Sequence, residues 1–181
     1  MASVVIVSGC PGAGKTTLAR ALAAAEDRGV HFVTDTFYEF IPNVIDPATP
    51  ASRHQNTVVM NAVARAARAF ADGEYTTFVD GVVGPWFLWA FREVLESGPS
   101  THYVVLQASE PAALARVRGR QGPGLSGTVR AMVTQFADLG VFARHGVATD
   151  GRSEEDVRSG VEVGLARGDF ALDWSLVSRP E

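Results

Sequence analysis

Residues 9–16 read Gly-Cys-Pro-Gly-Ala-Gly-Lys-Thr and match the pattern G-x-x-x-x-G-K-[ST]. The glycines of such a loop let the backbone turn tightly, so that its N–H groups point inward at phosphate oxygens. The lysine reaches the β- and γ-phosphates of a nucleoside triphosphate, and the hydroxyl that follows it binds Mg²⁺. The motif therefore predicts a site for ATP and Mg²⁺ formed by Gly9, Cys10, Pro11, Gly12, Ala13, Gly14, Lys15, Thr16 and Thr17.

The surroundings of this loop support a phosphate site over a chance glycine-rich turn. An apolar, β-branched run over residues 3–7 precedes it, and strong helix formers over residues 15–25 follow it. Lys15 is the single lysine of the chain, and the other 15 of its 16 basic residues are arginines. A compact ammonium group thus stands at the one position where a planar guanidinium would fit poorly.

Strands and helices are expected to alternate along the whole chain. Short apolar runs predict strands over residues 30–33, 76–79, 103–107 and 147–149, in addition to 3–7. Amphipathic or capped segments predict helices over 54–71, 85–96, 111–120, 128–139 and 153–166, in addition to 15–25. One face of the helix over 54–71 is expected to pack inward through Val59, Val63, Ala66 and Phe70. This alternation is typical of a single α/β domain over residues 1–181, with a parallel sheet covered on both faces.

Composition narrows the classes of partner. The net charge of −4 provides no basic field for nucleic acid or anionic lipid, and we expect neither as a partner. No run of about 18 apolar residues predicts a membrane span. Cys10 is the only cysteine, so no internal disulfide can form, which agrees with a cytoplasmic location. Either a monomer or a homodimer is compatible with this composition.

Three aspartates follow predicted strands, where ligands of parallel sheets bind. Asp35 is placed to orient or deprotonate an acceptor hydroxyl facing the γ-phosphate, and its alternative role is that of a helix N-cap. Asp80 is a candidate Mg²⁺ ligand together with Thr16, and its alternative role is that of a turn residue before Gly81. Asp150-Gly151 is interpreted as a turn.

A third group of candidates precedes a glycine-rich stretch. Arg116 and Arg120 lie four residues apart, on one face of a predicted helix, and could stack on adenine or neutralise the transferring phosphoryl group. Arg118 faces elsewhere. Residues 121–127 (Gln-Gly-Pro-Gly-Leu-Ser-Gly) are predicted to form a mobile loop, so that residues 116–130 would act as a lid. The alternative is a solvated helix end.

Taken together, these motifs resemble the small P-loop kinases, which include nucleoside monophosphate, shikimate and gluconate kinases. The features that carry the resemblance are the strand before the loop, Gly-x-Pro-Gly-x-Gly-Lys-Thr-Thr, the strand ending in Asp, and the late Arg-rich segment. Chloramphenicol phosphotransferase and tunicamycin-resistance ATP-binding proteins look most similar. The resemblance implies a three-layer P-loop NTPase sandwich with a five-stranded parallel sheet in the order 2-3-1-4-5. It also implies that Asp35 acts as a general base and that Arg116 and Arg120 serve ATP.

The expected activity is transfer of the γ-phosphoryl group of ATP to a hydroxyl of a small molecule, with an antibiotic as one candidate. The alternatives are an NTPase that drives a conformational switch and a non-catalytic protein that sequesters ATP and a drug. The acceptor is expected to be largely apolar and without a phosphate or carboxylate, because Arg53 and Arg92 are the only arginines between residues 35 and 92 that could reach it. Its pocket would draw on Phe37, Tyr38, Phe40, Trp86, Phe87, Trp89 and Phe91, unless these aromatic residues fill the core or a dimer contact.

Overall fold

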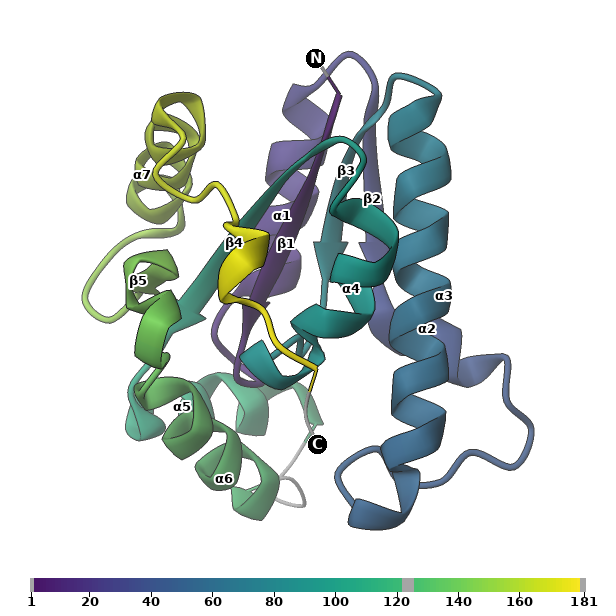
Figure 1. The fold of residues 1–181 in the computed structure, drawn as a ribbon. Helices are drawn as coiled ribbons and strands as arrows, with labels where there is room; N and C mark the ends of the chain where they lie inside the picture. The colour runs from purple at the N-terminus through teal and green to yellow at the C-terminus, as the bar shows by residue number, and fades with distance from the viewer. Residues whose placement is uncertain (1, 122–125, 180–181) are drawn as a thin grey trace.

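The computed structural model describes residues 2–121 and 126–179, which contain a five-stranded parallel sheet. The strands are β1 (Ser3–Gly9), β2 (Gly29–Val33), β3 (Thr76–Asp80), β4 (Ser100–Gln107) and β5 (Gly146–Ala148). Their order across the sheet is β2-β3-β1-β4-β5, as expected from the sequence (Figure 1). The three-layer α/β prediction is confirmed.

The central strand, β1, explains the apolar run at the start of the chain. Its residues 4–7 are at most 2% exposed, since β3 and β4 flank it and helices cover both faces. In the parallel register Val7 lies beside Asp80, and Gly9 lies beside Leu106. The loop after β1 therefore leaves the sheet at its middle, next to the last residue of β3.

Helices form the two outer layers. On one face α1 (Lys15–Ala25) packs against α7 (Glu154–Arg167), and on the other face α3 (Arg53–Asp72) packs against α4 (Leu88–Leu95). Three further helices lie near the carboxyl ends of the strands (Figure 1): α2 (Thr34–Glu39), α5 (Glu110–Gln121) and α6 (Ser126–Ala137). Short 3₁₀ helices span Pro50–Ser52, Pro85–Phe87, Gly140–His145 and Trp174–Leu176. The capping box predicted between Ser153 and Asp156 opens α7.

The inward face of α3 differs from the one expected. Val59 and Val63 are buried as predicted, but alanines complete the stripe, and Phe70 is 40% exposed. Small side chains let the helix approach the sheet closely, whereas the Phe70 ring lies at the sheet edge against Phe32, with ring centroids 5.3 Å apart. The predicted helix over 85–96 likewise begins as a 3₁₀ turn, and α4 itself starts at Leu88.

Both ends of the loop predicted over 121–127 are helical. Gln121 is the last residue of α5, and Ser126 and Gly127 already belong to α6, so the loop prediction over 121–127 was wrong at both ends. Burial of Val129 and Phe136 anchors α6, and tertiary packing of this kind outweighs the low helix propensity of Gly127. Residues 122–125 lie outside the described residues, so a lid over 116–130 remains a prediction.

Residues 168–179, here called the C-terminal segment, gave no clear signal in the sequence. Leu172 N donates to Thr101 O and Tyr103 N donates to Phe170 O, which joins the segment to the start of β4 in an antiparallel bridge. The segment then crosses in front of β4 toward α4 (Figure 1). Buried Val177 fixes it there, and the Arg92 guanidinium donates to Val177 O at 2.6 Å.

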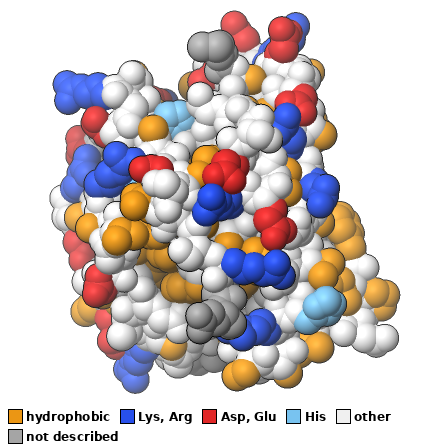
Figure 2. Space-filling model, viewed as in Figure 1, with side chains coloured by type: hydrophobic (Ala, Val, Ile, Leu, Met, Phe, Trp, Pro, Cys, Tyr) orange, Lys and Arg blue, Asp and Glu red, His pale blue; other side chains and the backbone are white. Residues whose placement is uncertain are grey.

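The surface of the described residues carries mixed charge. Acidic and basic side chains intermingle over the face shown in Figure 2. Among the described helices, none combines the length and the apolar character that crossing a bilayer requires.

Candidate functional site

The loop between β1 and α1 needs its glycines. Gly9, Gly12 and Gly14 have φ values of 138°, 83° and 101°, which side chains disfavour. A Cβ at Gly9 would collide with the Leu106 carbonyl oxygen, and one at Gly12 would lie 2.5 Å from the Ala113 oxygen. Gly14 caps α1 without a side-chain hydrogen bond, so the first N–H groups of α1 have no side-chain partner at the cap. The result is a helix N-terminus and loop suited to phosphate.

Lys15 turns back over this loop. Its Nζ donates to the Cys10 carbonyl at 3.1 Å. Burial lowers the pKa of Lys15, while the charges of Asp80, Cys10 and Asp35 act in the opposite direction. The ammonium group is thus held in a poorly solvated position, where phosphate oxygens would add further negative charge beside it.

Asp80 ends β3 as a buried carboxylate, 2% exposed, rather than as an exposed turn residue. Its Oδ2 lies 3.4 Å from Nε2 of His31, which comes from the neighbouring strand β2. Thr16 lies in the first turn of α1, which follows the phosphate loop. A hydroxyl and a carboxylate are hard oxygen ligands that suit Mg²⁺. This contact of His31 with Asp80 was not predicted from the sequence.

Asp35 lies in the first turn of α2 and is exposed. The N-cap of α2 is Val33, so the alternative role of Asp35 as an N-cap is wrong. One turn further on, burial and then the charge of Asp35 raise the pKa of Tyr38 to about 12, so this phenol stays protonated near neutral pH. Asp35 and Tyr38 both line the larger of two cavities.

The smaller cavity, of about 320 Å³, adjoins the loop on the α1 side. Gly12, Gly14 and Thr17 line it from the loop and α1, and Arg116 lines it from α5. The Arg116 guanidinium donates to Gly12 O at 3.1 Å, which brings this predicted residue to the loop. Arg120 belongs to α5, but its side chain lies outside the description.

Sequence reasoning missed the opposite wall of the smaller cavity. Thr149, Arg152, Ser153 and the start of α7 form it. Asp150 accepts hydrogen bonds from Ser109 N at 3.0 and 3.2 Å, and Gly151 has φ 70°, which agrees with the turn predicted there. Two features of the sequence indicated that these residues would lie near the carboxyl end of the sheet. They follow the strand predicted over 147–149, and the capping box at Ser153 begins the next helix.

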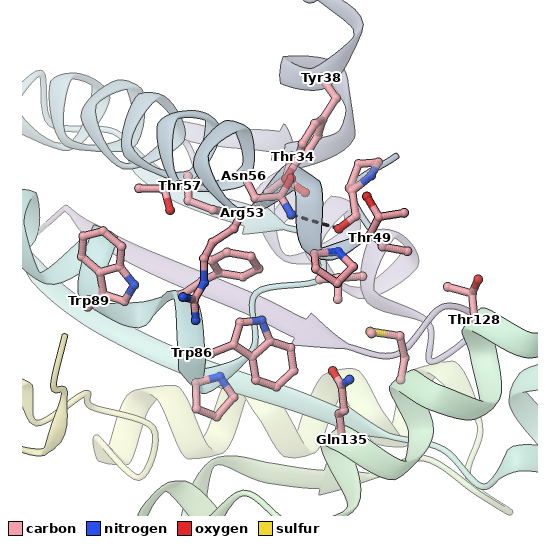
Figure 3. Close-up of a pocket in the computed structure, with 18 of the residues that line it drawn as sticks. Thr34, Tyr38, Thr49, Arg53, Asn56, Thr57, Trp86, Trp89, Thr128 and Gln135 are labelled. Carbon is pink, nitrogen blue, oxygen red and sulfur yellow. Dashed lines mark hydrogen bonds between the residues drawn. The ribbon is translucent and has the colours of Figure 1, made fainter. Parts of the chain in front are cut away.

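The larger cleft, of about 1480 Å³, lies between α3 and α6 (Figure 3). Pro11 of the loop borders it, and residues 47–57 and 85–89 form much of its wall. Of the seven predicted aromatic residues, Tyr38, Trp86, Phe87 and Trp89 line the cleft. The other three do not: Phe91 is fully buried in the core, Phe37 packs on Phe32, and Phe40 is 71% exposed.

The cations of this cleft differ from those expected. Arg53 lines it, as predicted. Arg92 does not line it; its guanidinium pairs with Glu96 and donates to Val177 O of the C-terminal segment. Arg179 of the C-terminal segment lines the cleft instead. The expectation of a largely apolar acceptor counted arginines only up to Arg92, so its premise was wrong.

Residues 5–125 match the family model described as AAA domain. The chain belongs to the AAA domain family. No curated protein matches it by sequence.

Solved structures resemble this AAA domain closely in fold. A sugar kinase from a Janibacter species has 20% identity over 92% of this chain and 95% of its own, with a TM-score of 0.71. A gluconokinase from Sinorhizobium meliloti has 20% identity over 91% and 92%, with a TM-score of 0.69. The tunicamycin resistance protein of Deinococcus radiodurans has 19% identity over the whole of both chains, with a TM-score of 0.65. The predicted small P-loop kinase fold is confirmed.

The matched AAA domain stretch includes Lys15, Asp35, Asp80 and Arg116 but ends before α6. The wall of the smaller cavity at Arg152 and the C-terminal segment with Arg179 lie beyond it. The smaller cavity and the larger cleft are thus each lined partly by residues that the family match does not cover.

Asp80→Asn is expected to raise the Mg²⁺ concentration needed for half-maximal nucleotide binding by ~10-fold, since an amide is a weaker ligand than a carboxylate. A Mg²⁺ titration of ADP binding, followed by calorimetry, measures this. Asp27→Asn, at an exposed position after α1, is the matched control. An unaltered Mg²⁺ titration in Asp80→Asn would count against a metal role.

Proposed function

We propose that this protein transfers the γ-phosphoryl group of ATP to a hydroxyl of a small molecule. The observation that carries the proposal is the position of the phosphate loop between two cavities. Gly12, Ala13 and Gly14 line the smaller cavity, and Pro11 borders the larger one. A nucleotide in the smaller cavity and an acceptor in the larger would meet at the loop, next to Asp35.

Each residue has a distinct part in this proposal. Lys15 and the loop N–H groups hold the β- and γ-phosphates, and Arg116 holds the nucleotide from α5, together with Arg120. Thr16 and Asp80 would hold Mg²⁺, which supplies charge neutralisation at the phosphates when it is bound. Asp35 orients the acceptor hydroxyl and takes its proton. The chain thereby contributes positioning and electrostatics rather than a covalent intermediate.

The larger cleft favours transfer over the two alternatives. An NTPase switch uses water as its only acceptor, and a water molecule does not require a cleft of about 1480 Å³. A purely sequestering protein would not need a carboxylate beside the loop, yet Asp35 lines the cleft there. Because one of the similar folds is a tunicamycin resistance protein, antibiotics belong among the acceptors to be tested.

A coupled assay of ADP release tests the proposal directly. Purified protein with ATP and Mg²⁺ is screened against sugars, sugar acids, nucleosides and hydroxylated antibiotics. We expect ADP release to depend on one class of acceptor and the phosphorylated product to appear by mass spectrometry. Equal ADP release with and without every acceptor would identify an NTPase, and binding of ATP without any ADP release would identify a sequestering protein.

Arg116→Ala is expected to raise the KM for ATP about tenfold, because a charged hydrogen-bond donor beside the loop is lost. Arg118→Ala provides the matched control, since Arg118 is exposed on the same helix and lines neither cavity. Steady-state kinetics with varied ATP measure both variants. The assignment of Arg116 to the nucleotide would be wrong if the two variants behaved alike.

A further inference from the structure

We propose that the acceptor carries an oxyanion, such as a carboxylate or a phosphate ester, which Arg53 and Arg179 bind together in the larger cleft. This inference rests on the proposed function, since it assigns the acceptor class of the same cleft. The two arginines come from distant parts of the chain, the start of α3 and the C-terminal segment, yet both line one cavity. They are the only arginines that do so among the described residues.

Arg53 has no evident structural role. It is the first residue of α3, and its guanidinium makes no hydrogen bond or ion pair with another described residue. The first turn of α3 contains no acidic residue, and a cation at the positive end of a helix is unfavourable. Figure 3 shows its guanidinium extended into the cleft, between Trp86 and Trp89. This exposed charge is therefore better explained by a ligand than by helix stability.

Arg179 is held against Trp89, another residue that lines this cleft, by the C-terminal segment. Buried Val177, bound through its carbonyl by Arg92, fixes the backbone two residues away. The Arg179 guanidinium carbon lies 4.9 Å from the centre of the Trp89 ring, a cation–π contact. Its ion pair with Glu93 is long, at 3.7 Å, and the side chain is 74% exposed. Its guanidinium thus stays accessible to a ligand.

The two acidic residues that line the cleft, Asp35 and Asp138, are engaged elsewhere. Asp35 lies near Lys15 and the phosphate loop, where its charge acts on the Lys15 ammonium. Asp138 lies just after α6, and its Oδ1 accepts a hydrogen bond from Gly140 N at 2.8 Å. Two guanidinium groups beside tryptophan rings form a setting in which an oxyanion can be bound through paired N–H donors. The aromatic rings would pack against the apolar part of the same molecule.

Binding of small probes tests the inference without requiring phosphoryl transfer. The full chain is titrated with para-hydroxymethylbenzoate and with the corresponding carboxamide, which has the same shape but no charge. The indole N–H resonances of the three tryptophans provide the readout by heteronuclear NMR. We expect the carboxylate to bind about tenfold more tightly than the carboxamide. The resonances of Trp86 and Trp89 should move, while that of Trp174, which does not line the cleft, should stay in place.

Variants then assign this preference to the two arginines. Arg53→Gln and Arg179→Gln should each remove most of the preference for the carboxylate, whereas Arg65→Gln, exposed on α3 and outside the cleft, should retain it. The unchanged Trp174 resonance verifies that each variant is folded. The para-hydroxymethylphenyl phosphate counterpart distinguishes recognition of a phosphate from that of a carboxylate, and a preference for either over the carboxamide supports the inference.

Two outcomes would overturn the inference: equal affinity for charged and neutral probes, or a preference that survives both arginine substitutions. Failure of the proposed transfer activity would be seen separately, as the absence of acceptor-dependent ADP release. If the protein prefers the carboxylate but transfers no phosphoryl group, the oxyanion site is supported and the proposed function is wrong.

Discussion

Lys15→Ala is expected to abolish phosphoryl transfer and to weaken ATP binding by at least ~10-fold, because a charge-assisted contact to the β- and γ-phosphates is lost. Lys15 is the only lysine of the sequence, and its ammonium group lies over the loop, 3.1 Å from the Cys10 carbonyl. No other described cation occupies this position inside the loop. Isothermal titration calorimetry with ATP and Mg²⁺ measures the change.

Two companion variants sharpen this result. Arg20→Ala removes an exposed cation of the same helix α1 and should leave ATP affinity unchanged. Lys15→Arg keeps the charge but replaces the compact ammonium with a planar group, so it should restore little activity. Wild-type ATP affinity in Lys15→Ala would refute the assignment of the loop as the nucleotide site.

Asp35→Asn is expected to reduce turnover by roughly 10²- to 10⁴-fold, the usual contribution of a general base. The affinity for ATP should change little, because Asp35 lines the acceptor cleft and not the smaller cavity. Turnover by coupled ADP release and ATP affinity by calorimetry separate the two effects.

Asp138→Asn is the matched control, because it removes another carboxylate from the same cleft. The Asp138 carboxylate is engaged by Gly140 N, so its loss should have a small effect on turnover. If Asp35→Asn and Asp138→Asn both kept near wild-type turnover, Asp35 would have no part in proton transfer.

The features that could be predicted from the sequence are those that short segments determine. The loop over residues 9–16 is recognisable because its glycine spacing, its lysine and its strand–helix context are all contiguous. The five strands were predictable because buried parallel strands are apolar runs. Asp80 could be placed at the carboxyl end of the sheet because it directly ends such a run.

The features that could not be predicted depend on contacts between distant segments. The contact of His31 with Asp80 depends on the pairing of β2 with β3, 49 positions apart. Arg92 was expected in the cleft, but its guanidinium donates instead to Val177 O of the C-terminal segment, 85 positions along the chain. That segment has no periodic pattern, so nothing in it indicated that Arg179 would reach the cleft. For the same reason, the expectation about the acceptor rested on too few arginines.

The central position of β1 has a consequence for synthesis of the protein. β1 is translated first, but its partners β3 and β4 end only at residues 80 and 107. At the usual pace of a ribosome, the strand waits on the order of 10 s for them. During that time an uncharged, β-branched segment is exposed, which is a composition that favours aggregation. The strand that carries the nucleotide loop is therefore also a segment with a tendency to aggregate until its partner strands have been synthesised.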